Sequence, residues 1–420
     1  MKTTEIRKPY RMEDFLQPQW FQKFSQMVHF HWQRNPEDDS MVNAPNRAFW
    51  WSAVCNILFF GFNIWDILVH MCMGKPSNQN PPVFSITVYF SIRGLMLFLK
   101  RKDIVEFVND LDRECPRDLA SQLDMEMDKT YQTFWQRYRF IWIYSHVGGP
   151  LFCLMPVALF LLTHEGKRSP VAQHEQLLGG WMPFGVRNDP NFYFLVWFVD
   201  VMCTTCGVSF FVTFDNLFNV MQGHLIMHLG HLARQISELD PRQSLTNEVQ
   251  FFEDLRLIVR RQQLLNGLCG RYNEIFKVAF LVSNFLGAGS LCFYLFVLSE
   301  TLDILTIAQY ILPTFVLVGF TFEICLRGTQ LEEASEGLES ALRCQEWYMG
   351  SRRYRKFYLL WLQYCQRTQK LGAFGLIEVN MVHFTEVSEV EMRSICLLVH
   401  FIYLQIMQLA YRLFTFLKSH

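Results

Sequence analysis

The sequence predicts an all-α fold, a polytopic membrane bundle of seven transmembrane helices with a cytosolic N-terminus and an extracellular C-terminus. Composition is the first reason: of 420 residues, 51% are hydrophobic and only 18% are charged, which is unusually apolar for a soluble globular protein. Runs of about 20 apolar residues, long enough to cross a bilayer, recur along the chain. Lys and Arg gather in alternate loops between those runs, which sets the orientation.

Six segments are long and apolar enough to span a membrane. Helices are the expected form, because lipid cannot satisfy exposed backbone groups and the chain lacks the alternating pattern of a membrane barrel. The fifth and sixth segments are separated by only three residues, so they should form a tight antiparallel hairpin. The six spans are residues 48–71, 82–99, 138–163, 191–216, 275–299 and 303–326.

The orientation follows from the positive charges. The N-terminal segment 1–47 and the loops after the second, fourth and sixth spans hold 28 Lys and Arg residues, whereas the loops on the other side hold 4. The positive-inside rule therefore puts the N-terminus in the cytosol. Residues 1–24 lack the apolar core of a signal peptide, which agrees. We expect a cytosolic segment, 1–47, followed by one membrane domain, 48–420.

Two cytosolic stretches, 100–137 and 327–370, are long, charged and periodic in apolar residues, as in FYLLWLQY. This period predicts helices that continue the membrane spans into the cytosol. Such a shape suits the packing of subunits against each other. The orientation is the inverse of a G-protein-coupled receptor's, and the second outer loop contains no cysteine that could tie it to the third span.

Several function classes are disfavoured by the residues. A net charge of −1 without a Lys/Arg block or a Gly-rich phosphate loop argues against a nucleic-acid partner. His29 and His31 form a close pair with no catalytic motif around them, so we expect no enzyme. No repeat relates the two halves, which disfavours a secondary transporter.

Two further polar features lie inside predicted spans. Cys203 and Cys206 form C-T-T-C, but without a second pair we expect structural thiols, with no metal and no cofactor. Arg93 and Asp200 lie in the second and fourth spans, where a charge is costly unless it is paired or faces water. They are candidates to pair with each other, and a helix-end or lipid-snorkelling position for Arg93 is the alternative.

Three stretches carry a family resemblance: GGWMPFGVRNDPNFYFLVW before the fourth span, QYCQRTQKLGAFGL before the last helix, and LAYRLFTFL near the end. Together with the length and the inverted topology, they resemble the insect odorant receptors. The resemblance covers the whole chain in architecture and is motif-specific in roughly the last quarter. A gustatory receptor of the same superfamily is the near alternative, disfavoured because its terminal TYxxxxxQF pattern is absent.

The resemblance implies an odorant-gated cation channel in the plasma membrane, multi-pass, in the dendrite of a sensory neuron. It implies a hetero-oligomer, a tetramer, with a shared co-receptor subunit, a small volatile ligand and the lipid bilayer as partners. Because the loop between the fourth and fifth spans is not enlarged, the chain resembles the ligand-tuning subunit rather than the co-receptor.

In the family a volatile ligand binds within one subunit's helical bundle, toward the outer leaflet. The outer halves of the second to sixth spans carry aromatic and Met side chains suited to an apolar, adaptable pocket, although ordinary helix packing is the plain alternative for each. These candidate ligand-binding residues are Tyr89, Phe90, Phe152, Met155, Phe192, Trp197, Met202, Phe293, Phe296, Gln309 and Tyr310.

The family's pore is lined by the last helix. By the terminal motif, the resemblance implies Thr415, Phe416 and Ser419 as pore residues, and Phe416 as a hydrophobic gate. A lipid-facing or packing role is the alternative for each. Arg412 stands where the family usually has a small or polar residue, which leaves the local register open.

Residues 387–405 interrupt the expected ending. In the family the segment after QRTQK leads into one continuous terminal helix. Here Val-Ser begins the interruption and Leu-Gln ends it, and these pairs can be encoded by GTGAGT and TTGCAG, the splice donor and acceptor sequences. Our hypothesis is a translated, retained intron; a genuine lineage-specific insertion is the alternative. Without the segment, 375–417 closes up to one span, and with it 394–417 is long enough to span alone.

Overall fold

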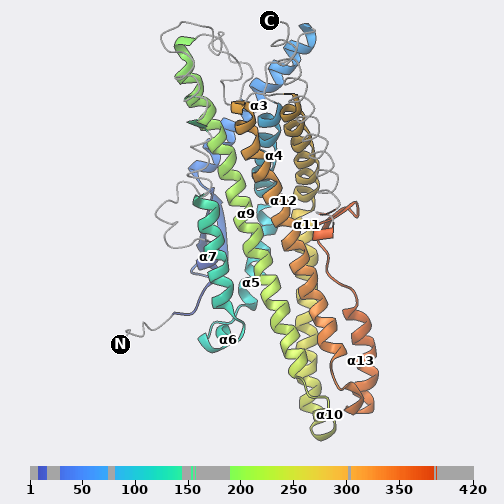
Figure 1. Ribbon diagram of the computed structural model, residues 1–420. Helices are drawn as coiled ribbons and strands as arrows, with labels where there is room; N and C mark the ends of the chain where they lie inside the picture. The colour runs from blue at the N-terminus through green and yellow to red at the C-terminus, as the bar shows by residue number, and fades with distance from the viewer. Residues whose placement is uncertain are drawn as a thin grey trace, which may run out of the picture.

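The computed structural model describes residues 8–16, 29–73, 81–143, 190–300 and 304–382, together with 153, 154, 157 and 385. These residues form an elongated bundle of helices (Figure 1). Its long members are α3 (Arg47–Met73), α4 (Pro81–Leu99), α9 (Tyr193–Glu238), α11 (Glu248–Glu300) and α12 (Ile304–Arg343). Five of the six predicted spans are therefore helical, and three of these helices run far beyond the span that they contain.

The predicted boundaries agree closely with the described helices at the start of the bundle. Helix α3 begins one residue before the first predicted span, and α4 begins one residue before the second. Within the described chain, Arg47–Trp65 and Tyr193–Glu238 are long and apolar enough to cross a membrane, with mean hydropathies of 1.3 and 1.8. The third predicted span, 138–163, is described only at its start, in α7 (Met127–Ile143), and at residues 153, 154 and 157.

The predicted hairpin of the fifth and sixth spans is confirmed. Helix α11 ends at Glu300 and α12 begins at Ile304, so only a short connection separates them. The two helices run side by side in Figure 1 and are in contact. Both helices continue far beyond the predicted spans. For α12 this continuation agrees with the periodic spacing of apolar residues in 327–370, which predicts a helix there.

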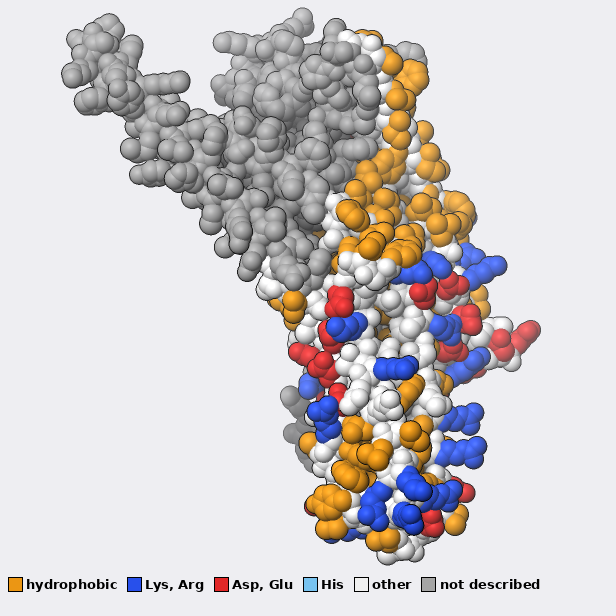
Figure 2. Space-filling model, turned by 90° about the vertical axis from the view of Figure 1, so that its right-hand side faces the viewer, with side chains coloured by type: hydrophobic (Ala, Val, Ile, Leu, Met, Phe, Trp, Pro, Cys, Tyr) orange, Lys and Arg blue, Asp and Glu red, His pale blue; other side chains and the backbone are white. Residues whose placement is uncertain are grey.

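The described surface differs between the two ends of the molecule. On the described part of the face in Figure 2, hydrophobic side chains cover the upper part, whereas the Lys, Arg, Asp and Glu side chains gather in the lower part, with hydrophobic side chains among them. The upper part includes α3, whose exposed side chains include three Trp residues, Trp50, Trp51 and Trp65. Contiguous exposed apolar surface of this kind is suited to lipid rather than to water. We call these two parts the membrane half and, after the location that the positive charges predict for it, the cytosolic half.

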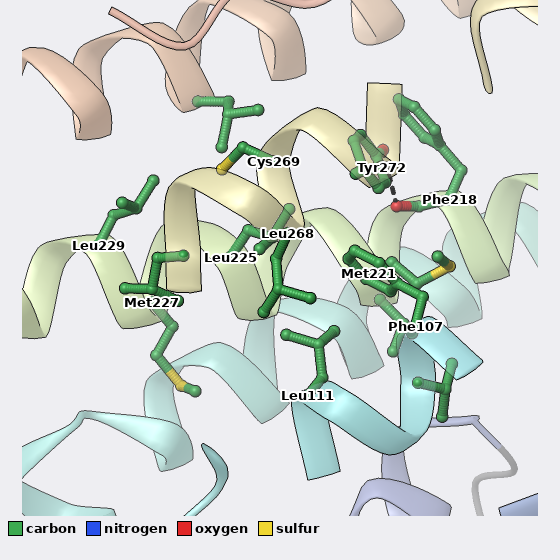
Figure 3. Close-up of a cluster of buried hydrophobic side chains, with 14 of the residues drawn as sticks. Phe107, Leu111, Phe218, Met221, Leu225, Met227, Leu229, Leu268, Cys269 and Tyr272 are labelled. Atoms are coloured by element: carbon green, nitrogen blue, oxygen red, sulfur yellow. Dashed lines mark hydrogen bonds between the residues drawn. The ribbon is translucent and has the colours of Figure 1, made fainter. Parts of the chain in front are cut away.

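The cytosolic half has its own hydrophobic core. Helix α5 (Arg101–Glu114) inserts Phe107 and Leu111 between α9 and α11. Figure 3 shows the Phe107 side chain next to Met221 of α9, and its ring centre lies 6.0 Å from that of Tyr272 of α11. The Tyr272 hydroxyl donates a hydrogen bond of 3.1 Å to the carbonyl oxygen of Phe218, which satisfies a polar group inside this core. The shorter helices of this half are α6 (Leu119–Asp124), α10 (Gln243–Thr246) and α13 (Arg352–Cys365).

The N-terminal segment folds onto the bundle. Helix α1 (Met12–Leu16) and an antiparallel hairpin of β1 (Phe30–Arg34) with β2 (Met41–Pro45) precede α3. Arg34 of β1 forms an ion pair of 3.0 Å with Asp112 of α5, whose side chain is buried. The hairpin thus modifies the all-α prediction only locally, and its charges attach the segment to the cytosolic half.

A second hairpin precedes the terminal region. Strand β3 (Gly372–Ala373) pairs with β4 (Ile377–Glu378), and the turn between them holds Phe374 and Gly375 at φ of 54° and 69°. With these left-handed values the full sequence forms no helix that starts at Gly375. The prediction of one span over 375–417 concerns a chain without residues 387–405, so it stays a prediction. Residues 387–405 and the rest of the terminal region lie outside the described residues.

Candidate functional site

The predicted ligand-binding residues fall into three groups. Five are described with their side chains: Tyr89 and Phe90 on α4, Phe192 in the short 3₁₀ helix Pro190–Phe192, and Trp197 and Met202 on α9. Four others lie on described helices, at positions where the structure describes the helix but not the side chain: Phe293 and Phe296 on α11, and Gln309 and Tyr310 on α12. Phe152 and Met155, like the pore residues Thr415, Phe416 and Ser419, lie outside the described residues.

An aromatic cluster joins three helices in the membrane half, toward its boundary with the cytosolic half. Phe90 of α4 packs on Phe211 of α9 with ring centroids 5.2 Å apart. Phe211 in turn packs on Phe320 of α12 at 4.2 Å. Tyr89 lies beside Phe90, at 5.7 Å, and is buried. Each such ring pair contributes roughly 0.5–1.5 kcal/mol beyond burial. This set, Tyr89, Phe90, Phe211 and Phe320, is the membrane aromatic cluster.

Sequence reasoning found two of its members and missed the other two. Phe211 and Phe320 lie toward the inner ends of the fourth and sixth predicted spans, whereas the predicted ligand-binding residues all lie in outer halves. Two features of the sequence could have indicated the missing residues: the adjacent aromatics at 210–211 and the stretch GFTF at 319–322. Only packing between helices shows which of these rings face each other.

Arg93 lies directly beneath the membrane aromatic cluster. Its side chain is buried, 2% exposed, and its guanidinium carbon lies 4.2 Å from the ring centre of Tyr89 and 5.0 Å from that of Phe211. Nη2 donates hydrogen bonds to the Tyr89 hydroxyl and, at 3.1 Å, to Ser283 Oγ of α11. Arg93 thus binds α4 to α9 and α11 through rings and hydroxyls, in a cation–π arrangement.

The predicted pair of Arg93 with Asp200 is wrong, and so is a lipid-snorkelling position. Asp200 precedes Phe211 by eleven residues on α9, which is about 16 Å along a helix axis, too far from the Arg93 guanidinium. No described residue accepts a hydrogen bond from the buried Nε and Nη1 atoms of Arg93. Aromatic rings lie directly against this cation, and the Asp215 carboxylate acts on it from beyond ion-pair distance.

The three remaining described candidates lie nearer the start of α9. Trp197 Nε1 donates a hydrogen bond of 2.7 Å to the carbonyl oxygen of Cys153, so it connects α9 to the third predicted span. Met202 is half-buried, and Phe192 is 44% exposed. Of the five, the structure therefore brings only Tyr89 and Phe90 into direct contact with each other.

The C-T-T-C cysteines are buried on α9. Cys203 packs with Phe59 of α3 and with Cys153, and both Cys203 and Cys206 are buried. Among the described residues, no group of three or more His, Cys, Asp or Glu side chains is arranged to hold a metal ion. These thiols act there as small apolar packing groups.

An ion network lies where the membrane half meets the cytosolic half. Arg137 of α7 pairs with Asp215 of α9 at 3.0 Å and with Glu323 of α12. Arg137 also donates a hydrogen bond to Asn219, one turn further along α9. The Arg137 and Asp215 side chains are only 12% and 5% exposed. This network, Arg137, Asp215, Asn219 and Glu323, joins three helices just below the membrane aromatic cluster.

Comparison with known sequences places the chain among receptors. The family model described as 7tm Odorant receptor matches residues 73–392. Odorant receptor 88a of Drosophila melanogaster is 76% identical over 420 residues, an alignment that covers 100% of both chains. Putative odorant receptor 85d of the same organism is 23% identical over 349 residues, covering 79% of this chain and 81% of that relative.

The fold has solved counterparts. The insect olfactory receptor OR5 from Machilis hrabei, in complex with eugenol, superposes with a TM-score of 0.69 at 14% sequence identity. That match covers 92% of this chain and 99% of the other. A second structure of the same receptor gives a TM-score of 0.65. At this identity the likeness establishes the fold.

Proposed function

Because this chain belongs to the 7tm odorant receptor family, we propose that it is the ligand-tuning subunit of an odorant-gated cation channel. Insect members of this family are channels of that kind and work with a co-receptor. The chain is a receptor and not an enzyme, with a polytopic membrane fold. The observation that carries the proposal is the identity of 76% over the full length to an odorant receptor. That match also decides against the gustatory and transporter alternatives.

The ligand site that we propose lies at and above the membrane aromatic cluster. The half-buried Phe90 would offer its ring to a small volatile molecule, and the half-buried Met202 an adaptable apolar side chain. The buried rings of Tyr89 and Phe211 pack behind Phe90. The candidates on α11 and α12, Phe293, Phe296, Gln309 and Tyr310, belong to the helices that pack against this region. Phe152 and Met155 complete the proposed lining from the third span.

The orientation and location that we propose are a cytosolic N-terminus and an extracellular C-terminus in the plasma membrane of a sensory neuron's dendrite. The surface of the described residues supports a placement across the membrane, since the apolar half lies above a charged half (Figure 2). The charged half contains the Lys- and Arg-rich loops, which the positive-inside rule assigns to the cytosol.

We also propose a tetramer with the co-receptor that assembles through the cytosolic half. Helix α13 buries Tyr354, Tyr358 and Trp361 against the rest of the chain. Its other face leaves Leu359 and Leu360 exposed by 58% and 68%. Apolar side chains exposed in the water-facing half favour a protein partner over lipid.

The pore and the interrupting segment are further parts of the proposal. Thr415, Phe416 and Ser419 would line the conduction path in the last helix. Residues 387–405 would be a retained intron. The family match ends at residue 392, inside this segment and before the terminal motif LAYRLFTFL.

The test is odorant-evoked current in cells that express an insect co-receptor with this chain, either as given or with 387–405 deleted. Cells with the co-receptor alone are the control. Current that requires the chain supports the receptor proposal, and current only from the deleted form supports the retained intron as well. Silence of both forms across a broad odorant panel, with surface expression verified, would overturn the proposal.

A further inference from the structure

A cleft in the cytosolic half lies well away from the membrane aromatic cluster. It has a volume of about 640 Å³ and opens between α5 and α6 on one side and α9 and α11 on the other. This volume is typical of a small-molecule site. Its polar lining includes Ser121, Asp124, His231, Arg260 and Arg261.

Two adjacent arginines of α11 enter this lining without a carboxylate partner. Among the residues that the structure describes, no Asp or Glu forms an ion pair with Arg260 or Arg261, whereas Arg271 on the same helix pairs with Asp110 at 2.5 Å. Arg261 contacts only the Nδ1 atom of His228, at 3.4 Å, and the sulfur of Met125, at 4.0 Å. These weak contacts leave most of its donors unused.

Arg261 is also partly removed from water. Its Nε atom is buried and has no hydrogen-bond partner, and burial lowers the pKa of its guanidinium. A buried donor without an acceptor costs roughly 1–3 kcal/mol, and more when it is charged. The carboxylates of the lining offset this cost only in part: Glu114 acts on Arg261 electrostatically from beyond ion-pair distance, and Asp124 faces His231 Nδ1 at 3.5 Å.

We propose that this cleft binds a phosphate-bearing small molecule of the cytosol, with Arg260 and Arg261 as its cationic ligands. A guanidinium presents a planar fork of N–H donors that matches two phosphate oxygens. Two neighbouring guanidinium groups, one exposed and one half-buried, supply such forks at the mouth and at the wall of the cleft.

The distance of the cleft from the membrane favours a soluble anion over a lipid headgroup as its ligand. Arg261 precedes the fifth predicted span, which begins at residue 275, by fourteen residues of the continuous helix α11. That separation is about 21 Å along the axis, whereas the headgroup region of each leaflet is only about 5–8 Å thick. An anion here would contact helices that also build the cytosolic core, and its binding would stabilise the folded receptor.

The experiment uses the full-length chain purified with a co-receptor in lipid-free detergent, with inorganic pyrophosphate as the probe. We expect a saturable rise in the melting temperature against sodium chloride of equal ionic strength. Arg260→Gln should raise the half-saturating pyrophosphate concentration about tenfold, since a charge-assisted hydrogen bond contributes roughly 1.5 kcal/mol. Arg261→Gln should do the same. Arg256→Gln, one turn earlier on α11 and outside this cleft, is the matched control and should leave it unchanged.

Three outcomes would overturn the proposal. One is no rise for the unmodified chain, and another is a rise that persists in the double variant Arg260→Gln/Arg261→Gln. The third is stabilisation only in nanodiscs that contain a phosphatidylinositol phosphate, which would assign the site to lipid. Because Arg260 is exposed, its variant is expected to fold even if the Arg261 variant does not. The readout needs no odorant, so its result is independent of the proposed receptor function.

Discussion

The two halves of the molecule hold a buried arginine in opposite ways. In the membrane half, Arg93 lies among the rings of Tyr89, Phe211 and Phe214. It forms no ion pair with a carboxylate of the described residues, and Asp215 acts on it only from beyond ion-pair distance. At the boundary with the cytosolic half, Arg137 is bound to two carboxylates. The same side chain therefore packs as an aromatic partner in one region and as the centre of an ion network in the other.

This difference indicates in which half substitutions can alter ligand binding without a large loss of stability. Ring contacts are adaptable in shape, so a site built from them suits ligands that vary among related receptors. An ion network has a strict geometry and leaves a costly charge behind when one member is lost. We therefore assign ligand recognition to the membrane half and structural connection to the cytosolic half, and four predictions test that assignment.

The largest expected effect is at the ion network. Arg137→Met should lower the free energy of unfolding by about 3 kcal/mol, because it removes the guanidinium that pairs with both the Asp215 and the Glu323 carboxylates. Arg327 also acts on these carboxylates electrostatically, so the expected loss is at the lower end for a broken buried pair. Denaturant unfolding of the purified chain in detergent measures this loss. Arg139→Met, two residues further along α7 at an exposed position, is the control and should change little. Equal effects of the two substitutions would remove the network from the account.

The second effect is a dependence on pH in the cytosolic half. Burial lowers the pKa of His224 from 6.5 to about 4. The unfolded chain therefore takes up a proton at this residue as the pH falls below 6.5, and the folded chain does so only near pH 4. Stability should fall across that window, by up to roughly 1.4 kcal/mol per pH unit.

His224→Phe keeps an aromatic ring against Phe15 and Phe134 and removes the titrating group. The slope of stability between pH 6.5 and 4 should become shallower in this variant. His31→Gln, at an exposed position of β1, serves as the matched control. An unchanged slope in His224→Phe would show that other groups determine the acid sensitivity.

A smaller effect is expected at the arginine of the membrane half. Arg93→Met removes a cation that has no carboxylate partner, so no opposite charge is left uncompensated. The loss of its hydrogen bonds to Tyr89 and Ser283 is offset by the removal of a buried charge. The free energy of unfolding should change by no more than about 1 kcal/mol. A loss as large as that of Arg137→Met would contradict the comparison between the halves.

The smallest effect belongs to an exposed pair. Arg242 and Glu346 form an ion pair of 2.7 Å with side chains 60% and 54% exposed. Glu346→Gln should therefore lower stability by less than about 1 kcal/mol, and the loss should shrink further in high salt. A salt-independent loss above that size would mean that the pair acts as part of the core.

Much of the fold could be predicted from the sequence, because bilayer crossing requires a long apolar run. That rule located α3 and α4 to within a few residues and predicted the short connection between α11 and α12. It could not predict the hairpin of β1 and β2. Its formation depends on Arg34 meeting Asp112, a contact across 78 positions of the chain.

The candidate site was less predictable for a similar reason. Tyr89 and Phe90 were found because they are aromatic and lie on the second span, but Phe211 and Phe320 depend on how α9 and α12 rotate toward α4. The partner of Arg93 was also mispredicted, since charge alone suggested Asp200 and the structure uses rings. Helix rotation and long-range pairing are set by packing, which local composition does not encode.

One measurement tests the division of labour between the halves most directly. It compares odorant concentration–response curves and co-receptor recovery for Phe90→Ala in the membrane half and Leu360→Asp in the cytosolic half. We predict that Phe90→Ala raises the half-maximal concentration about tenfold, as a loss of about 1.4 kcal/mol would, with normal co-receptor recovery. Leu360→Asp should reduce recovery of the co-receptor and leave the half-maximal concentration unchanged. The reverse pattern, altered odorant response from Leu360→Asp and altered assembly from Phe90→Ala, would contradict the account.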